Sequence, residues 1–248
     1  MKDFLRRVWS LWFGFWLVSY FIVMLPVYGL VLWRQTPWTI RLGHQLNRLW
    51  GKLILLMGGI RLRHIGYHFP STPCILVANH RSYLDIPVCY VSFPPRVAFL
   101  GKAELARIPL YGWTYRRLHV IVDRKDPAAR KKSLLAVARK LKAGISILIY
   151  PEGTTKHPKP LGRFYDGAFS LATELKVPLL PFVIVGSDRC LSGDGRFLMQ
   201  PGTVTCVFHP LIYPQGETAE SLREKVYTWM HETLSKYENN SHPTGHLV

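Results

Sequence analysis

A histidine and a carboxylate stand five positions apart, His80 and Asp85, after the apolar segment Cys74–Ala78. A histidine at the end of a buried strand lies at the rim of a sheet, where α/β proteins place their sites. On a regular helix the two side chains would lie about 140° apart, so they meet only if His80 belongs to a loop and Asp85 to the following first turn. Asp85 would then orient the imidazole, and the ring would take a proton from a substrate hydroxyl.

The same spacing permits a second interpretation. Ser82 and Asp85 fit the S-x-x-D pattern of a helix capping box, in which the two residues satisfy backbone groups at a helix start. His80 would then be an incidental loop residue. The spacing alone leaves both interpretations open.

Three later segments also place distinctive residues beside apolar runs. Arg124 follows Val120–Val122, and a guanidinium there can bind a phosphate through two parallel hydrogen bonds. Glu152 follows Ile147–Tyr150 on a Pro-Glu-Gly turn, and Val177–Pro181 opens the next apolar run. Each segment alone is weak evidence, because a charge after a strand is usually solvated. The four segments in this order are specific.

In order and content these segments resemble the glycerolipid acyltransferases typified by 1-acylglycerol-3-phosphate acyltransferase, over about residues 60 to 215. Asn79–Asp85 resembles the family's N-H-x4-D block, and Val122–Arg124 resembles its second block. Tyr150–Thr154 is similar to the F-P-E-G-T block, and Val177–Pro181 to the fourth, proline-containing block.

The resemblance implies roles for these residues. His80 is implied as the general base on the acceptor hydroxyl and Asp85 as its partner. The second and third blocks are implied to bind the acceptor and its phosphate, and the fourth to lie near the acyl donor or the pocket. The residues implied to bind substrate are Asn79, Arg124, Glu152, Gly153 and Thr154, and those implied at the donor or pocket are Pro178 and Pro181. Lys156, which departs from the family's pattern, is added to the substrate-binding residues because of its charge.

Two blocks depart from the family's pattern. The second block usually opens with Gly, and here Leu118 or His119 stands in that place. The third block differs at both of its ends. Tyr150 stands where the family commonly has Phe, and Thr155-Lys156 stands where it commonly has Arg-Ser. Without that arginine, the positive charge for a phosphate is expected from Lys156 or Arg163.

The reaction implied is direct transfer of a fatty acyl group from acyl-CoA or acyl carrier protein to the sn-2 hydroxyl of 1-acylglycerol-3-phosphate, giving phosphatidic acid. The hydroxyl oxygen attacks the thioester carbonyl as His80 removes its proton. Ser82 sits in no nucleophile-elbow pattern, so no acyl-enzyme is expected. The sequence has no HExxH, EF-hand, Walker A or G-x-G-x-x-G motif, so we expect no cofactor and no metal.

Two alternatives stay open. The missing arginine favours an acyltransferase that acts on another lysophospholipid or on a lyso-aminolipid. A non-enzymatic alternative is a basic protein that binds membranes or nucleic acid. The four ordered segments argue against a binder, and Arg130–Lys142 lacks the interleaved aromatic residues that stack on bases.

The elements around these segments predict an α/β domain from about residue 61, with a mixed central sheet flanked by helices. One helix is predicted over Pro127–Ala143, capped by Asp126, and another over about residues 218–237. The predicted strands are Ile60–His64, Cys74–Ala78, Val97–Leu100, Val120–Val122, Ile145–Tyr150, Leu180–Val185 and Val204–Phe208.

The N-terminal region predicts a hydrophobic helical membrane anchor. Val8–Trp33 has 26 residues without a charge, which as a helix would reach roughly 39 Å against a hydrocarbon core of about 30 Å. Lys2 and Arg34 flank it as interfacial anchors. A cleaved signal peptide is disfavoured because the run is long and rich in Trp and no small-x-small site follows. Pro26 leaves two topologies open, a single span or a hairpin within one leaflet.

The next stretch, Thr39–Met57, has apolar residues on one helical stripe and basic residues about 120° away. It predicts either an amphipathic helix on the membrane surface or a basic helix packed on the catalytic domain. The stripe consists of Leu42, Leu46, Leu49, Trp50, Leu53, Leu56 and Met57.

The total charge alone does not choose among anionic partners, but its position along the chain favours a membrane. The formal charge is +17 with 48% hydrophobic residues, and residues 1–66 contribute +8, from nine basic residues and one acidic residue. Charge of this size predicts an anionic partner, here acidic lipid, a phosphorylated acceptor and a polyanionic thioester carrier, with no nucleic acid.

Four cysteines without a C-x-x-C pair favour a reduced, cytosolic domain.

We therefore predict an anchor and interfacial helix over residues 1–60, a catalytic domain over 61–238 and a tail over 239–248. The predicted location is a bacterial inner membrane, with the catalytic domain on the cytoplasmic side.

Overall fold

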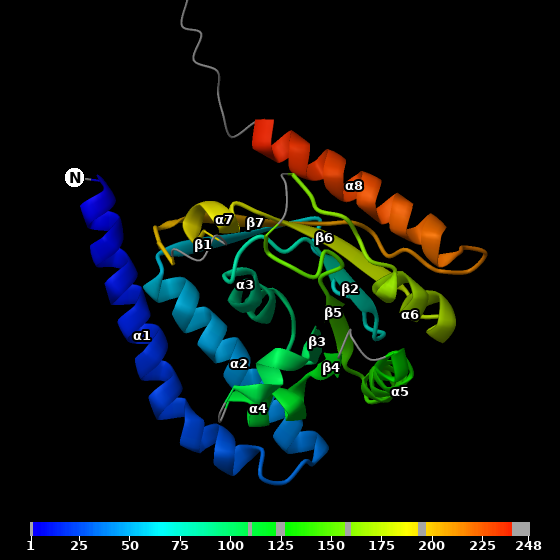
Figure 1. Ribbon diagram of the computed structural model, residues 1–248, viewed down its shortest axis with the longest axis horizontal. Helices are drawn as coiled ribbons and strands as arrows, with labels where there is room; N and C mark the ends of the chain where they lie inside the picture. The colour runs from blue at the N-terminus through cyan, green and yellow to red at the C-terminus, as the bar shows by residue number, and fades with distance from the viewer. Residues whose placement is uncertain (1, 109–110, 123–126, 157–159, 193–196, 240–248) are drawn as a thin grey trace, which may run out of the picture.

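A seven-stranded sheet forms the centre of the protein in the computed structural model, which describes residues 2–108, 111–122, 127–156, 160–192 and 197–239 (Figure 1). The strand order is β1-β7-β6-β2-β5-β3-β4. All neighbours are parallel except β6 and β7, which are antiparallel, so the sheet is mixed as predicted. The strands are β1 (Ile60–Ile65), β2 (Ile75–Ala78), β3 (Val97–Lys102), β4 (Val120–Val122), β5 (Ser146–Ile149), β6 (Leu179–Val185) and β7 (Gly202–Phe208).

Helices cover both faces of this sheet. The seven predicted strands and both predicted domain helices are present, with shifts of one or two residues at their ends, while Asp126, the predicted cap, lies outside the described residues. The helical elements are α1 (Lys2–Val31), α2 (Pro37–Met57), α3 (Asp85–Ser92), the 3₁₀ helix η1 (Ala103–Arg107), α4 (Tyr111–Leu118), α5 (Pro127–Lys142), α6 (Gly167–Leu175), α7 (Ser187–Cys190) and α8 (Ala219–Asn239).

The core has two layers because alternate residues of a strand point to opposite faces. In β2, Leu76 and Ala78 pack in a cluster with residues of α2 and α3, whereas Ile75 and Val77 pack in a cluster with residues of α5, α6 and α8. The central strands are buried on both faces, which explains why they are continuous apolar runs in the sequence.

Helix α1 is a continuous 30-residue helix that lies along the domain beside α2 (Figure 1). Pro26 lies inside it and does not divide it. Among the described residues, the segment Phe4–Val31 is the one helix long and apolar enough to cross a membrane. Two hydrogen bonds tie it to the domain: in its first third, Ser10 Oγ accepts from the Met199 amide at 2.8 Å, and, one residue past its end, the Leu32 carbonyl accepts from Arg117 Nε at 3.0 Å.

Helix α2 packs on the domain through a face that the leucine stripe did not predict. Gly51 lies so close to α3 that a Cβ atom there would stand 2.9 Å from the Pro87 carbonyl oxygen. Ile54, which falls off the predicted stripe, is buried, while Leu49 and Leu56 of the stripe are exposed. The helix is therefore packed on the domain, as one interpretation predicted, and it presents Leu49 and Leu56 outward, while its contact with a membrane surface stays a prediction.

Candidate active site

Residues 79–84, between β2 and α3, form a loop that we name the catalytic loop. The side chain of its first residue, Asn79, pairs with the backbone of β6. Asn79 Nδ2 donates to the Ile184 carbonyl at 2.9 Å, and the Ile184 amide donates to Asn79 Oδ1 at 2.7 Å. These two bonds continue the pairing of β2 with β6. Because both polar atoms of the Asn79 side chain are used and the residue is fully buried, we expect Asn79 to position the loop and not to contact substrate.

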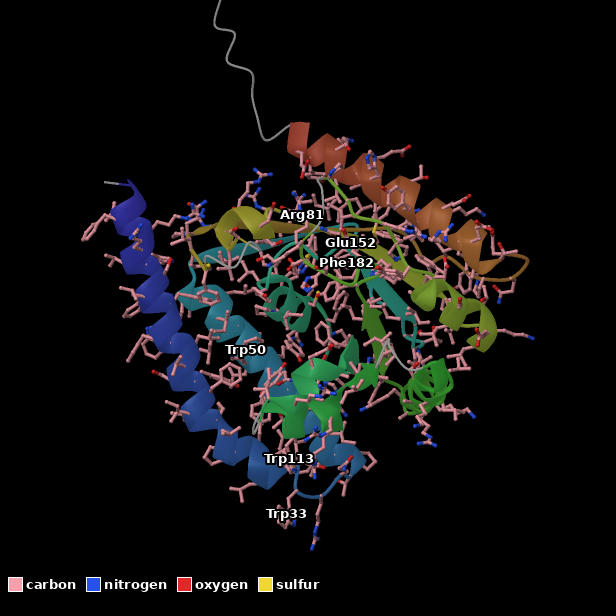
Figure 2. The ribbon with its side chains drawn as sticks, viewed as in Figure 1. Trp33, Trp50, Arg81, Trp113, Glu152 and Phe182 are labelled. Atoms are coloured by element: carbon pink, nitrogen blue, oxygen red, sulfur yellow. The ribbon has the colours of Figure 1, made fainter. Side chains whose placement is uncertain are left out.

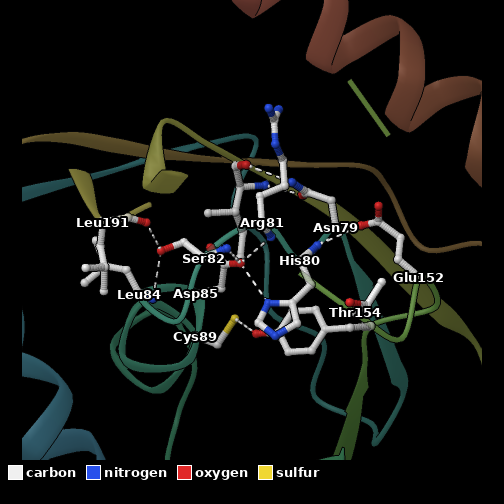
Figure 3. A network of polar contacts seen from close by, with 12 residues as sticks. Asn79, His80, Arg81, Ser82, Leu84, Asp85, Cys89, Glu152, Thr154 and Leu191 are labelled. Atoms are coloured by element: carbon white, nitrogen blue, oxygen red, sulfur yellow. Dashed lines mark hydrogen bonds and ion pairs between the residues drawn. The ribbon is translucent and has the colours of Figure 1, made fainter. Parts of the chain in front are cut away.

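His80 and Asp85 meet as the spacing required, with His80 in the loop and Asp85 as the first residue of α3 (Figure 3). His80 Nδ1 lies 2.8 Å from Asp85 Oδ2. The same oxygen accepts from the amides of Arg81 at 2.8 Å and Ser82 at 3.0 Å. Asp85 is fully buried, whereas the His80 side chain is 16% exposed. The carboxylate thus holds the ring and the loop backbone at once.

One half of the capping box is present as well. The Ser82 amide donates to the Asp85 carboxylate, but Ser82 Oγ accepts from the Leu84 amide at 3.1 Å and donates to the Leu191 carbonyl at 2.6 Å. The two interpretations of the spacing therefore coexist, and His80 is a part of the network. With its hydroxyl proton on a buried carbonyl, Ser82 is poorly placed to act as a nucleophile.

Tyr150 lies directly under the imidazole. Its ring stacks on His80 with centroids 4.1 Å apart and planes 14° apart, and its hydroxyl lies 3.3 Å from Cys89 Sγ. Burial raises the pKa of both Tyr150 and Cys89 well above their ordinary values, so both stay neutral. The Cys89 thiol gives the buried Tyr150 hydroxyl a partner, which explains how tyrosine is accommodated at this position.

Glu152 joins three loops. Its Oε1 accepts from the His80 amide at 2.8 Å, and its Oε2 accepts from the Gly162 amide at 2.7 Å. The side chain is almost fully buried, at 3% exposure. Gly153 follows with φ +67°, a left-handed conformation that favours glycine, and its amide donates to the Tyr150 carbonyl. Glu152 therefore acts on the site mainly by holding His80 and the loop of Gly162 in place.

The predicted phosphate-binding residues are at the surface or outside the described chain. Thr154 Oγ1 accepts from the amide of Lys156, and Lys156 is exposed. Arg163 is also exposed, directly after the buried Gly162. Arg124 lies outside the described residues.

The two prolines predicted near the donor lie within β6 or at its start. The Pro178 carbonyl accepts from the Ile75 amide at the beginning of β2, which is the end of the sheet opposite His80. Pro181 is buried in mid-strand and pairs with Val77. The structure therefore does not bring these prolines to His80, and their role at the donor stays a prediction.

Sequence reasoning did not single out Arg81, although it lies between His80 and Ser82. Its side chain, at 7% exposure, forms ion pairs with Asp188 and Glu238. A charged residue directly after His80, in the loop that follows an apolar strand, was the available signal, but its partners lie more than 100 positions away. Within the described ranges, no group of three or more His, Cys, Asp or Glu side chains could hold a metal ion. That no metal takes part stays a prediction.

Comparison with known proteins finds relatives over most of the chain. A family model described as Acyltransferase matches residues 35–185. A chloroplastic 1-acyl-sn-glycerol-3-phosphate acyltransferase of Brassica napus is 30% identical over 166 residues, covering 66% of this chain and 47% of its own. A lyso-ornithine lipid O-acyltransferase of Pseudomonas aeruginosa is 32% identical over 143 residues, covering 52% of this chain and 55% of its own. The chain spans about half the length of the first curated relatives that it matches.

A solved structure resembles almost the whole fold. The crystal structure of the 1-acyl-sn-glycerophosphate acyltransferase PlsC from Thermotoga maritima aligns with a TM-score of 0.79 at 26% identity, covering 96% of this chain and 98% of that one. The likeness thus extends beyond the sheet to the N-terminal helices.

Proposed function

Since the chain belongs to the acyltransferase family, we propose that it transfers a fatty acyl group from an acyl thioester to the free sn-2 hydroxyl of 1-acylglycerol-3-phosphate, giving phosphatidic acid. The observation that carries this proposal is the contact of 2.8 Å between His80 Nδ1 and Asp85 Oδ2 at the rim of the sheet. It is the geometry of a histidine base with an orienting carboxylate.

The direction of proton transfer follows from this contact. Asp85 accepts a hydrogen bond from Nδ1, which assigns the ring proton to Nδ1 and the proton-accepting role to Nε2. Nε2 removes the proton of the acceptor hydroxyl as its oxygen attacks the thioester carbonyl. The developing imidazolium then lies against the buried Asp85 carboxylate and stacks on the neutral ring of Tyr150. When the tetrahedral intermediate collapses, the C–S bond breaks and the proton on Nε2 passes to the leaving sulfur, which departs as the thiol and leaves His80 neutral.

Binding of the acceptor's phosphate is proposed for residues at the rim of the site. Lys156 and Arg163 are exposed cations. Lys156 lies four positions after Glu152, and Arg163 directly follows Gly162, whose amide donates to the Glu152 carboxylate. Arg124 is proposed as a third contact from the family resemblance. The amide of Gly153 already donates to Tyr150, so we do not assign it to the oxyanion of the intermediate.

The N-terminal helix pair is proposed to hold the site at the membrane. Helix α1 exposes a large set of apolar side chains, and hydrogen bonds in its first third and just past its end tie it to the domain. Because α1 is continuous through Pro26 and is tied to the domain in this way, we propose that it lies within one leaflet as an unbroken helix, not as the hairpin that a break at Pro26 would give, and that it does not cross the bilayer. A membrane acceptor can then reach His80 from the lipid while a soluble donor, acyl-CoA or acyl carrier protein, reaches it from the cytoplasm. We propose the cytoplasmic side of a bacterial inner membrane as the location.

A second candidate acceptor is a lyso-ornithine lipid. Its support is the 32% identity with the Pseudomonas aeruginosa lyso-ornithine lipid O-acyltransferase, together with Thr155-Lys156 in place of the usual Arg-Ser. A zwitterionic head group needs a weaker positive site than a phosphate monoester does.

A panel experiment separates these acceptors. Membranes that contain the full-length protein are incubated with 1-acylglycerol-3-phosphate, other lysophospholipids and lyso-ornithine lipid, each with acyl-CoA and with acyl carrier protein thioester. Phosphatidic acid as the dominant product supports the first proposal. Acylated ornithine lipid as the dominant product would replace it, and no product from any pair would overturn both. Membranes containing the Arg223→Gln protein serve as a matched control, since Arg223 lies on α8 away from the catalytic loop and forms its ion pair with Asp166.

A further inference from the structure

The Arg81 side chain connects the catalytic loop to the last helix of the fold. Its Nη2 lies 2.9 Å from Asp188 Oδ2 on α7, and its Nη1 donates to Glu238 Oε1 in the last turn of α8. Glu238 lies 157 positions after Arg81 in the chain. Figure 2 shows Arg81 near Glu152 at the sheet edge below α8, far from Trp33 at the turn of the N-terminal helices.

The backbone of the same residue bonds to the catalytic carboxylate. The Arg81 amide donates at 2.8 Å to Asp85 Oδ2, the oxygen that also contacts His80 Nδ1 at 2.8 Å. The direction of this amide depends on the peptide plane between His80 and Arg81. Two carboxylates fix the Arg81 side chain and with it this peptide plane. The Arg81 amide therefore keeps the direction in which it holds Asp85 toward His80.

Helix α8 is a rigid support for this arrangement. Its apolar face is completely buried against the sheet, and its last buried residue lies one turn before Glu238. The buried residues of that face are Leu222, Val226, Met230 and Leu234. Glu238 is therefore presented to Arg81 from a helix that packing holds in place.

We propose that Arg81 is a positioning residue for the acyl transfer, which Asp188 and Glu238 hold so that its amide keeps Asp85 in line with His80. This inference rests on the proposed function. Because two carboxylates engage the guanidinium, Arg81 does not bind the acceptor's phosphate. Loss of the bridge formed by Arg81, Asp188 and Glu238 then lowers kcat, while the KM for the acceptor changes little.

The bridge is tested by substitution at both of its ends in the full-length protein. Arg81→Ala is expected to lower kcat about 100-fold, as expected when a reacting group is misplaced by about 1 Å. Glu238→Gln replaces the carboxylate acceptor by a neutral amide oxygen, which weakens the bond to Arg81, and is expected to lower kcat about tenfold. Arg81→Lys is expected to fall between wild type and Arg81→Ala, because an ammonium keeps the charge but not the planar fork. Arg223→Gln breaks another α8 ion pair and is expected to leave kcat unchanged.

A double substitution distinguishes positioning from general stabilisation. If Arg81 acts through Asp85, Arg81→Ala adds little to the defect of Asp85→Asn, because the group that it positions has already lost its charge. A residue that merely stabilises the fold would instead multiply the two defects.

Hydrogen exchange gives a readout that does not depend on activity. The amides of Arg81 and Ser82, both bonded to Asp85, are expected to exchange faster in Glu238→Gln than in wild type, and at the wild-type rate in Arg223→Gln. If the wild-type protein transfers acyl groups while Glu238→Gln keeps both its kcat and its protection, the inference is overturned and the proposed function stands. If wild type transfers no acyl group but Glu238→Gln loses protection, the proposed function fails and the bridge is supported. Glu238→Gln carries the test alone if Arg81→Ala does not fold.

Discussion

The catalytic loop and helix α1 are held in opposite ways. In the loop, Asn79, Ser82 and the Asp85 that follows it are fully buried, and residues 79–82 bond to segments 72 to 157 positions away. Helix α1 instead leaves Leu11 at 76% and Leu30 at 82% exposure. Directional hydrogen bonds fix the loop in a single geometry, whereas the attachment proposed for the outer face of α1 rests on non-directional contact with lipid. Single substitutions should therefore be severe in the loop and moderate on α1.

The most severe effect is expected from the base itself. His80→Ala is expected to lower kcat by about 10²- to 10⁴-fold, the usual contribution of a general base. The measurement is acyl transfer to the preferred lysolipid in vesicles, with vesicle binding and melting temperature as controls for fold and attachment. Transfer near the wild-type rate would mean that the loop has only a structural role. Its difference from α1 would then not concern catalysis.

Glu152 tests whether a residue can be essential without contacting substrate. Glu152→Ala leaves the His80 and Gly162 amides without their acceptor, so kcat is expected to fall about 100-fold through misplacement of His80. The free energy of unfolding is expected to fall by about 1–3 kcal/mol for each buried amide that stays unsatisfied. Kinetics and chemical denaturation measure the two effects.

The matched control for Glu152 is Glu232→Gln, an exposed carboxylate on α8 that is expected to change neither quantity. If Glu152→Ala raised the acceptor KM and left kcat and stability intact, Glu152 would be a binding residue and the loop would not need its support.

Helix α1 should respond to charge on its outer face. Leu11→Lys removes an exposed apolar side chain from contact with lipid, and the vesicle partition coefficient is expected to fall about 10- to 100-fold, which corresponds to about 1.5–3 kcal/mol for one buried side chain. Co-sedimentation with vesicles measures the partition. Turnover of a water-soluble short-chain acceptor is expected to stay at the wild-type rate.

Leu135→Lys is the control for this change, because Leu135 is a half-exposed leucine on α5, which is not part of the N-terminal helix pair. Equal losses of vesicle binding in both variants would show that charge anywhere weakens attachment, and the proposed role of α1 would then fail.

Features formed by residues close in the sequence can be predicted from it, whereas contacts between distant segments cannot. The seven strands are predictable because buried central strands such as Ile75–Ala78 are continuous apolar runs between turn residues. His80 and Asp85 are predictable because both belong to one short segment. The partners of Asn79 and Arg81 are not, because Ile184 and Glu238 are brought near only by the folded sheet and by α8.

Helix α2 shows a different limit. A hydrophobic stripe identifies an amphipathic face but not what covers it, and here close approach through Gly51 buries another face. Glycine leaves no apolar signal in the periodicity, so the packed face could not be read from the pattern of leucines.

The smallest effect is expected at His44, a buried polar residue of α2 that contrasts with those of the catalytic loop. His44 is 2% exposed, and neither of its ring nitrogens has a hydrogen-bond partner among the described residues. Burial, with the nearby Lys140 charge, lowers the pKa of His44 to about 3. His44→Leu removes this unsatisfied group and is expected to raise the free energy of unfolding at pH 7 by about 1 kcal/mol without changing kcat.

The pH dependence and a neighbouring histidine make this prediction specific. Between pH 6.5 and 3 the unfolded chain gains a proton that the folded His44 does not take, so wild-type stability is complete above about pH 6.5 and is lost as the pH falls. The advantage of His44→Leu should therefore grow on acidification. His119, whose ring centroid lies 6.1 Å away, is bonded to Tyr90 and to the Phe99 amide, so His119→Leu is expected to destabilise at pH 7. If His44→Leu were destabilising at pH 7 like His119→Leu, His44 would have a partner, and buried polar groups would stabilise the α2 interface as they do the catalytic loop.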